Sequence, residues 1–221
     1  MTGSTATRTH VPTDGEKEVG GGPKTIPEKN EKEDSPAEVS AVTTVENAST
    51  GNSLVVLQVN CRSICNKVLE FWNLIETHNP DVVIGTESWL HEEINNAELF
   101  RDDYITFRRD RCSRGGGVFI CVKNHIVCRE LWMDEDYEMI AIEIKSRNLK
   151  FTWEIAGIHG APNEDMRVLE RLAARTVCTS NSAKRSIIGG DLNFPQVDWN
   201  ENAGGNNVTQ ALINSFVREN S

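Results

Sequence analysis

Four polar side chains follow short apolar segments that have the composition of β-strands. Asn60 ends the run LVVLQVN, Glu87 follows DVVIGT, and Asp191 and Asn193 end SIIGGDLN. Ligands bind at the carboxyl ends of strands in layered α/β proteins, because the loops diverge there. Two carboxylates and two amides on one such rim would supply the hard oxygen ligands that Mg²⁺ or Mn²⁺ prefers. A metal ion held there could polarise a phosphoryl oxygen and stabilise the leaving oxyanion.

Each of these residues also has a simpler explanation. Asn and Asp are common after strands because they favour turns. Glu is a poor turn residue, and Glu87 lies in the otherwise apolar segment VVIGTESWL, so a functional role is favoured for it. For the other three residues both explanations stay open.

The segments around these residues predict strands that alternate with helices. Residues 54–60 and 81–88 are expected to be strands, joined by an amphipathic helix over 67–79 that Pro80 ends. Further elements are predicted as follows: short strands in 116–123, 126–131, 139–145 and 151–158, a helix in 165–181, a strand in 185–194 and a final helix in 208–220. This order favours a layered α/β sandwich in which helices cover the sheet faces.

Residues 1–53 differ from the rest in composition. They are rich in Thr, Ser, Glu, Lys, Gly and Pro and contain no aromatic residue. Such a segment buries too little apolar surface to offset the entropy lost on ordering. We therefore expect residues 1–53 to be disordered and residues 54–221 to form the folded domain.

Composition also bears on the compartment of the protein. No apolar run approaches the ~18 residues of a membrane span, and the N-terminal residues lack the apolar core of a signal peptide. The six cysteines form no CxxC pair and no zinc-type spacing with histidine. A reduced, intracellular protein without structural zinc and without a membrane partner is expected.

The net charge of −10 is unusual for a nucleic-acid partner, because phosphate binding is largely electrostatic. Four arginines are, however, clustered in FRRDRCSRGGG, residues 107–117. An acidic domain with one dense basic loop is compatible with a metal site that also contacts phosphate. A solvated surface turn explains the same loop equally well.

Five segments together resemble successive motifs of the endonuclease/exonuclease/phosphatase superfamily. The form GGDLNFPQVDW is most similar to the endonuclease domain of non-LTR retrotransposons of the jockey type. The resemblance extends from Leu54 to the C-terminus. It implies two mixed β-sheets flanked by helices. The motifs are QVNCRSI, DVVIGTESWL, RRDRCSRGGGVFI, IHGAPNED and IIGGDLNFPQVDW.

The resemblance implies a role for each matching residue. Asn60 and Glu87 match the metal ligands of the family, which bind Mg²⁺ or Mn²⁺. Asp191 matches the aspartate that positions or activates the attacking water, and Asn193 matches the amide that contacts the scissile phosphate. His159 stands where the family usually has a tyrosine; it could still donate a hydrogen bond to phosphate, although its charge would vary near neutral pH.

The resemblance also implies that DNA is the partner. Arg62, Arg111 and Arg114 would contact the DNA backbone without reading its sequence. The family's domain continues past the GGDLN motif to a Ser-Asp-His, whereas no histidine follows His159 here and no reverse transcriptase is present. We therefore expect a C-terminally truncated domain with weak or no activity.

Three functions remain open from the sequence. The first is a metal-dependent DNA endonuclease of a retrotransposon, which nicks target DNA to prime reverse transcription and acts in the nucleus. The second is a non-catalytic remnant or a domain repurposed for binding. The third is a phosphatase of the same superfamily, which the GGDLNFPQVDW segment disfavours.

Overall fold

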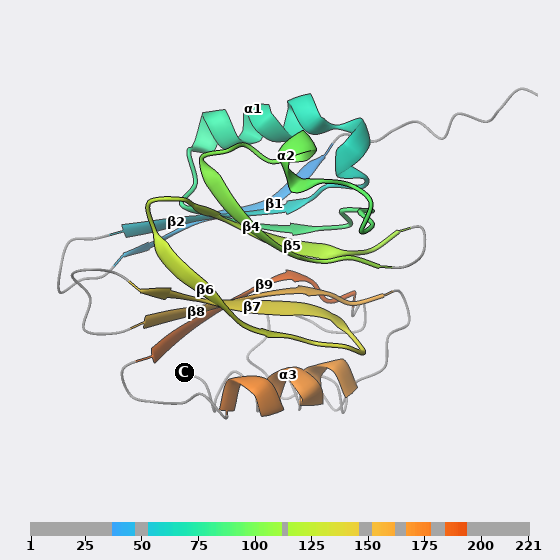
Figure 1. The fold of residues 1–221 in the computed structure, drawn as a ribbon. Coiled ribbons are helices and arrows are strands. Elements are labelled where there is room, and N and C mark those ends of the chain that lie inside the picture. Colours follow the sequence, from blue (N-terminus) through green and yellow to red (C-terminus); the bar gives the residue numbers. More distant parts are fainter. Residues whose placement is uncertain are drawn as a thin grey trace, which may run out of the picture. The chain divides into compact units, whose positions relative to one another are not determined.

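Two β-sheets pack face to face in the computed structural model of the chain (Figure 1). The structure describes residues 37–46, 53–111, 115–145, 152–161, 167–177 and 184–193. Its elements are β1 (Glu38–Glu46), β2 (Ser53–Asn60), the 3-10 helix η1 (Ile64–Asn66), α1 (Val68–His78), β3 (Val82–Thr86), α2 (Asn96–Leu99), β4 (Tyr104–Arg109), β5 (Val118–Lys123), β6 (Val127–Met133), β7 (Glu138–Lys145), β8 (Thr152–His159), α3 (Arg167–Val177) and β9 (Lys184–Asp191).

Both sheets are mixed. The first has the strand order β1-β2-β3-β5-β4, in which β2 and β3 run parallel and the other neighbours run antiparallel. The second has the order β6-β7-β8-β9, in which β8 and β9 run parallel and the other neighbours run antiparallel. The predicted layered sandwich of two mixed sheets with flanking helices is confirmed.

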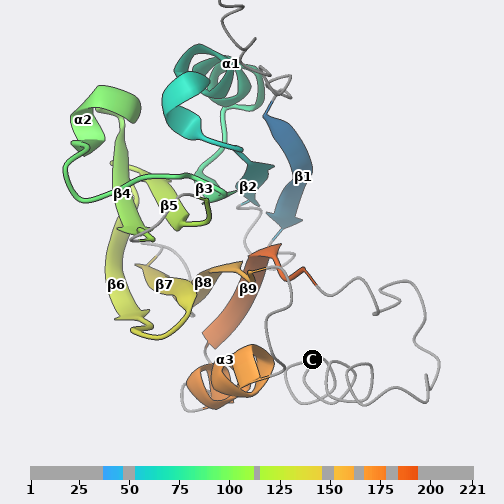
Figure 2. The same cartoon turned by 90° about the vertical axis from the view of Figure 1, so that its right-hand side faces the viewer.

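Three apolar layers hold this arrangement together. Side chains of β3 and β5 meet those of β7 and β8 between the sheets. Helix α1 covers the outer face of the first sheet, and α3 packs against the second sheet (Figure 2). Because both faces of β3 are covered, it is buried at all five positions, which explains its continuous apolar sequence.

Helix α1 forms where the sequence predicted it. Its buried face presents Phe71 and Ile75 to the sheet, and the Phe71 ring meets Phe119 of β5 edge to face with 5.7 Å between centroids. The helix ends because Asn79 adopts a left-handed conformation, with φ 44, and Pro80 follows it. This ending directs the chain into β3.

Two expectations from the sequence are wrong in part. Part of the segment expected to be disordered, Glu38–Glu46, forms β1 and pairs antiparallel with β2. Its β-branched valines and threonines suit a strand, and backbone pairing to β2 needs no aromatic side chain. The basic stretch was expected to be a loop, yet Arg108 and Arg109 lie in β4, paired with Phe119 and Val118.

Two further expectations concern the end of the chain and the membrane. The helix expected in 208–220 lies outside the described residues. Among the helices that the structure describes, none is long and apolar enough to cross a membrane.

The parallel strand pairs bring the candidate residues to one rim. Asn60, the last residue of β2, pairs with Thr86, so Glu87 follows immediately on the neighbouring strand. His159 and Asp191 pair as the last residues of β8 and β9. The fold therefore places the ends of four strands, two from each sheet, at the same edge of the sandwich.

Candidate active site

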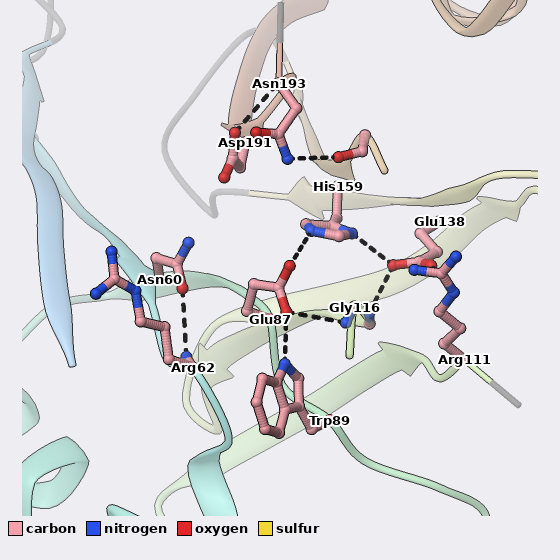
Figure 3. A network of polar contacts seen from close by, with 12 residues as sticks. Asn60, Arg62, Glu87, Trp89, Arg111, Gly116, Glu138, His159, Asp191 and Asn193 are labelled. Atoms are coloured by element: carbon pink, nitrogen blue, oxygen red, sulfur yellow. Dashed lines mark hydrogen bonds and ion pairs between the residues drawn. The ribbon is translucent and has the colours of Figure 1, made fainter. Parts of the chain in front are cut away.

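Glu87 lies at the centre of this rim and links the two sheets. Its Oε1 is 2.7 Å from Nε2 of His159, and its Oε2 accepts hydrogen bonds from the backbone N–H of Gly116, at 2.9 Å, and from Nε1 of Trp89 (Figure 3). The hydrogen bond from His159 lowers the pKa of Glu87 to about 2, against an opposing effect of burial. The carboxylate is therefore ionised throughout the physiological range.

His159 is buried between two carboxylates. Its Nε2 contacts Glu87, and its Nδ1 lies 2.7 Å from Oε2 of Glu138. Burial alone would lower the pKa of His159, but the hydrogen bonds to Glu138 and Glu87 outweigh it and raise the pKa to about 9. At neutral pH the ring is thus an imidazolium that donates one N–H to each carboxylate.

Glu138 belongs to the site, although the sequence did not indicate it. It is the first residue of β7, directly opposite His159 in the antiparallel pair. Its carboxylate also accepts the backbone N–H of Gly117, at 2.6 Å, and forms an ion pair with Nε of Arg111, at 3.1 Å. Arg111, which the sequence predicted to contact DNA phosphate, forms this ion pair, and its contact to DNA stays a prediction.

The glycines between β4 and β5 allow the backbone to approach the two carboxylates. Gly116 and Gly117 have φ angles of 75 and 87, a region that disfavours side chains. A Cβ on Gly116 would lie 2.6 Å from Oε2 of Glu138, and one on Gly117 would lie 2.3 Å from Oγ of Ser88. Side chains are therefore disfavoured in this hairpin, whose N–H groups bind Glu87 and Glu138.

Asp191 and Asn193 are held in place at the end of β9. Oδ1 of Asp191 accepts the backbone N–H of Asn193, at 3.1 Å, and Nδ2 of Asn193 donates to the carbonyl of Gly160, at 2.7 Å. The backbone N–H of Gly160 in turn donates to the carbonyl of Asp191, at 2.7 Å. A further bond from Nε2 of Gln58 in β2 to the carbonyl of Gly190, at 2.7 Å, ties β9 to the first sheet.

Asn60 and Arg62 form the remaining side of the rim. The backbone N–H of Arg62 donates to Oδ1 of Asn60, at 3.3 Å, and the next residue, Ser63, donates its N–H to the carbonyl of Glu87, at 2.9 Å. The side chain of Arg62 is exposed, as a contact to DNA requires. Arg114, the third expected DNA contact, lies outside the described residues.

Backbone strain is concentrated at this rim. Positive φ angles occur at six non-glycine residues in the described part of the chain, and one of them, Asn79, only ends α1. The other five are Arg62, Ser63, Glu87, Trp89 and Asn193. Such conformations cost about 1–3 kcal/mol each and gather where function requires a side chain to be aimed.

The residues present fit a sparsely coordinated Mg²⁺ or Mn²⁺. Mg²⁺ keeps several waters and takes one or two carboxylates from the protein. A carboxylate has roughly four acceptor positions. Glu87 uses three of them to accept hydrogen bonds from His159, Gly116 and Trp89, so one position remains among the contacts described. Asn60 provides an amide oxygen on the neighbouring strand. No group of three or more His, Cys, Asp or Glu side chains within the described ranges is arranged to hold a metal ion.

Comparison with known proteins identifies the fold. No family model matches the chain, and no curated protein matches it by sequence. Among solved structures, the endonuclease domain of TRAS1, a telomere-specific non-LTR retrotransposon, superposes with a TM-score of 0.56 at 16% identity, over 74% of this chain and 70% of that one. The chain has the fold of the endonuclease/exonuclease/phosphatase superfamily.

Two further structures are similar over a smaller share of their length. An AP endonuclease from Archaeoglobus fulgidus gives a TM-score of 0.48 at 18% identity, over 62% of this chain and 56% of that one. Humanized D. rerio TDP2 gives 0.47 at 13% identity, over 63% and 62%. The chain thus spans less than two thirds of these two structures.

Proposed function

We propose that this chain is a DNA endonuclease domain of the retrotransposon type that hydrolyses phosphodiester bonds with the help of Mg²⁺ or Mn²⁺. The observation that carries the proposal is the convergence of Asn60, Glu87, His159, Asp191 and Asn193 on one strained rim. The similarity to the TRAS1 endonuclease domain supports DNA as the substrate. A protein that nicks chromosomal DNA would act in the nucleus.

Glu87 and Asn60 would hold the metal ion. When bound, the ion supplies a Lewis acid that polarises the phosphoryl oxygen and stabilises the leaving oxyanion. Glu87 suits this role because its lowered pKa, about 2, keeps it anionic without a proton to displace. The hydrogen bonds from Gly116 and Trp89 fix the orientation of the carboxylate.

Asp191 and Asn193 would act on water and on the phosphate. Oδ1 of Asp191 already accepts an N–H from Asn193, which fixes the carboxylate so that it can accept a hydrogen bond from the attacking water. Nδ2 of Asn193 donates one of its two hydrogens to the carbonyl of Gly160, and the second hydrogen can be donated to a phosphate oxygen. Donors that are fixed before the reaction need no reorganisation in the transition state.

One observation favours the alternative of a non-catalytic binding domain. His159 already neutralises Glu87 with a charged hydrogen bond, at a position where the family that the sequence resembles has a neutral tyrosine. A cation at Glu87 would share the carboxylate with this imidazolium. The contact with His159 does not exclude a metal ion, because one acceptor position of Glu87 remains. It does weaken the attraction between the Glu87 carboxylate and a metal ion.

A substrate panel separates the candidate functions. The chain is incubated with Mg²⁺ and either supercoiled plasmid or a phosphomonoester such as p-nitrophenyl phosphate. Slow nicking of the plasmid, in line with the weak activity expected from the sequence, without phosphomonoester hydrolysis is the expected result. Hydrolysis of the phosphomonoester alone would indicate a phosphatase, and DNA binding without cleavage would indicate the binding domain.

A further inference from the structure

Trp89 is an exposed aromatic side chain beside the candidate active site. It lies two residues after Glu87 and is 45% exposed, whereas its neighbours Ser88 and Leu90 are 1% and 2% exposed. The other large hydrophobic side chains that the structure describes as exposed are aliphatic and lie on α1, β4 and β6. Among the residues that the structure describes, Trp89 is therefore the exposed large hydrophobic side chain that is aromatic, and it lies at this rim.

The backbone holds Trp89 in this position at a cost. Its φ angle is 55, and its backbone N–H donates to the carbonyl of Gly116, at 2.9 Å. Burying a large apolar side chain would stabilise the fold by about 1.5–3 kcal/mol. The chain instead adopts a strained conformation that leaves the ring half in solvent, which points to a ligand.

The part of the indole ring that makes no hydrogen bond to the protein indicates what kind of ligand Trp89 can bind. An indole has one hydrogen-bond donor, Nε1–H, and here that donor binds Oε2 of Glu87 (Figure 3). The same contact anchors one edge of the ring. A phosphate would need a free donor, so the part of Trp89 that a ligand can use is its flat π face. In DNA the matching flat surfaces are the nucleobases, which stack on aromatic side chains.

We propose that Trp89 stacks on an unpaired nucleobase of the DNA strand whose phosphate lies at Glu87. This inference rests on the proposed function, since it takes DNA as the ligand. Bases inside a duplex stack on one another and hide their faces, so a base that reaches Trp89 must leave the stack. Substrates with single-stranded character, such as gapped or mismatched DNA, are therefore bound more tightly than intact duplex.

The rival explanation is that Trp89 serves only to orient Glu87. Two variants separate these roles, because both lose the N–H that binds Glu87. Trp89→Phe keeps an aromatic face, whereas Trp89→Leu has none. A purely orienting role predicts that the two variants behave alike, and a stacking role predicts that they differ. Leu69→Ala serves as the control, because Leu69 is an exposed hydrophobic residue of α1, at 73%, outside the rim.

The experiment measures DNA affinity by fluorescence anisotropy in EDTA, where no metal-dependent cleavage occurs. The probes are a labelled oligothymidylate, the same length of backbone without bases, and a matched duplex. Circular dichroism melting establishes that each variant is folded. Trp89→Leu should bind oligothymidylate roughly 5- to 150-fold more weakly than Trp89→Phe, the range expected for one stacked base. The base-less backbone should bind both variants equally, and Leu69→Ala should match the wild type.

The outcomes distinguish this proposal from the proposed function. Equal affinity of Trp89→Phe and Trp89→Leu for oligothymidylate would overturn stacking, even if the wild type nicks DNA. A Trp89→Leu defect of the same size on the base-less backbone would overturn it as well. A base-dependent defect in a protein that nicks nothing would support stacking and contradict catalysis. A wild type that binds none of the probes would overturn both.

Discussion

The imidazole of His159 and the carboxylate of Glu87 face each other across the two sheets, with 2.7 Å between Nε2 and Oε1. Glu138 completes the arrangement from the far side of the ring, at 2.7 Å from Nδ1. A buried imidazolium between two carboxylates is stable because each of its N–H groups has a charged acceptor. The contact joins the sheets at the edge where the candidate active site lies.

This contact predicts a definite dependence of stability on pH. The pKa of His159 is raised from 6.5 to about 9, so its contribution is full below 6.5 and is lost as the pH rises through 9. The pKa of Glu87 is lowered from 4.5 to about 2, so its contribution is full above 4.5 and is lost as the pH falls through 2. Thermal melts should show the largest advantage of the wild type over His159→Gln between pH 4.5 and 6.5. An advantage that grows above pH 9 would contradict the assignment.

Strand β1 should stabilise the domain. A chain that starts at residue 37 keeps β1, whereas one that starts at residue 53 leaves β2 with an unpaired edge. The shorter chain should melt at a lower temperature and aggregate more readily, because an open edge pairs with other chains. Melting and light scattering of the two chains provide the comparison. Identical behaviour would show that β1 contributes nothing.

The same substitution should have very different effects at two glycines. A Cβ on Gly190, with φ 141, would lie 1.8 Å from the backbone carbonyl oxygen of Ile158, so Gly190→Ala should cost more than about 3 kcal/mol. Gly115, with φ 88, has no neighbour nearer than 3.9 Å, so Gly115→Ala should cost about 1–2 kcal/mol from backbone conformation alone. Denaturant unfolding measures both. An equal loss of stability in the two variants would contradict the close approach of the β8 and β9 backbones at Gly190.

Divalent metal should bind through Glu87. Mn²⁺ binding is followed by electron paramagnetic resonance in the wild type, in Glu87→Gln and in Glu76→Gln. Glu76 is the matched control, because it is 65% exposed on α1 and pairs with Arg101. Glu87→Gln should weaken binding by at least about tenfold, since even losing a group that only supports a ligand costs about 10–100-fold. Unchanged binding in Glu87→Gln would remove Glu87 from the metal site, and an equal loss in Glu76→Gln would show that the effect is not specific to this site.

The sequence could predict the rim because strand ends are local features. Asn60, Glu87 and Asp191 each end an apolar run, and the parallel pairing of β2 with β3 and of β8 with β9 brings such ends together. Glu138 could not be predicted in this way. Its role depends on the antiparallel register that sets it opposite His159, 21 residues away in sequence, and register is a tertiary property.

The two errors in the predicted elements have a similar origin. β1 contains few large side chains, so composition gives no sign of the backbone pairing to β2 that orders it. β4 carries arginines that suggest a solvated loop. In the structure the guanidinium of Arg108 binds the carbonyl of His91, Oδ1 of Asn96 and the carboxylate of Asp110. Charged side chains fit an edge strand when neighbouring loops supply such acceptors.

The most direct test of the central claim is a supercoiled-plasmid nicking assay with Mg²⁺, run with the wild type, Glu87→Gln and Glu76→Gln side by side. The account predicts slow nicking by the wild type and by Glu76→Gln, its abolition by EDTA, and a further loss on the order of 10² or more in Glu87→Gln, as for other single groups that stabilise a transition state. Nicking by Glu87→Gln at the wild-type rate would contradict the account, and so would a wild type that leaves the plasmid supercoiled at every Mg²⁺ concentration.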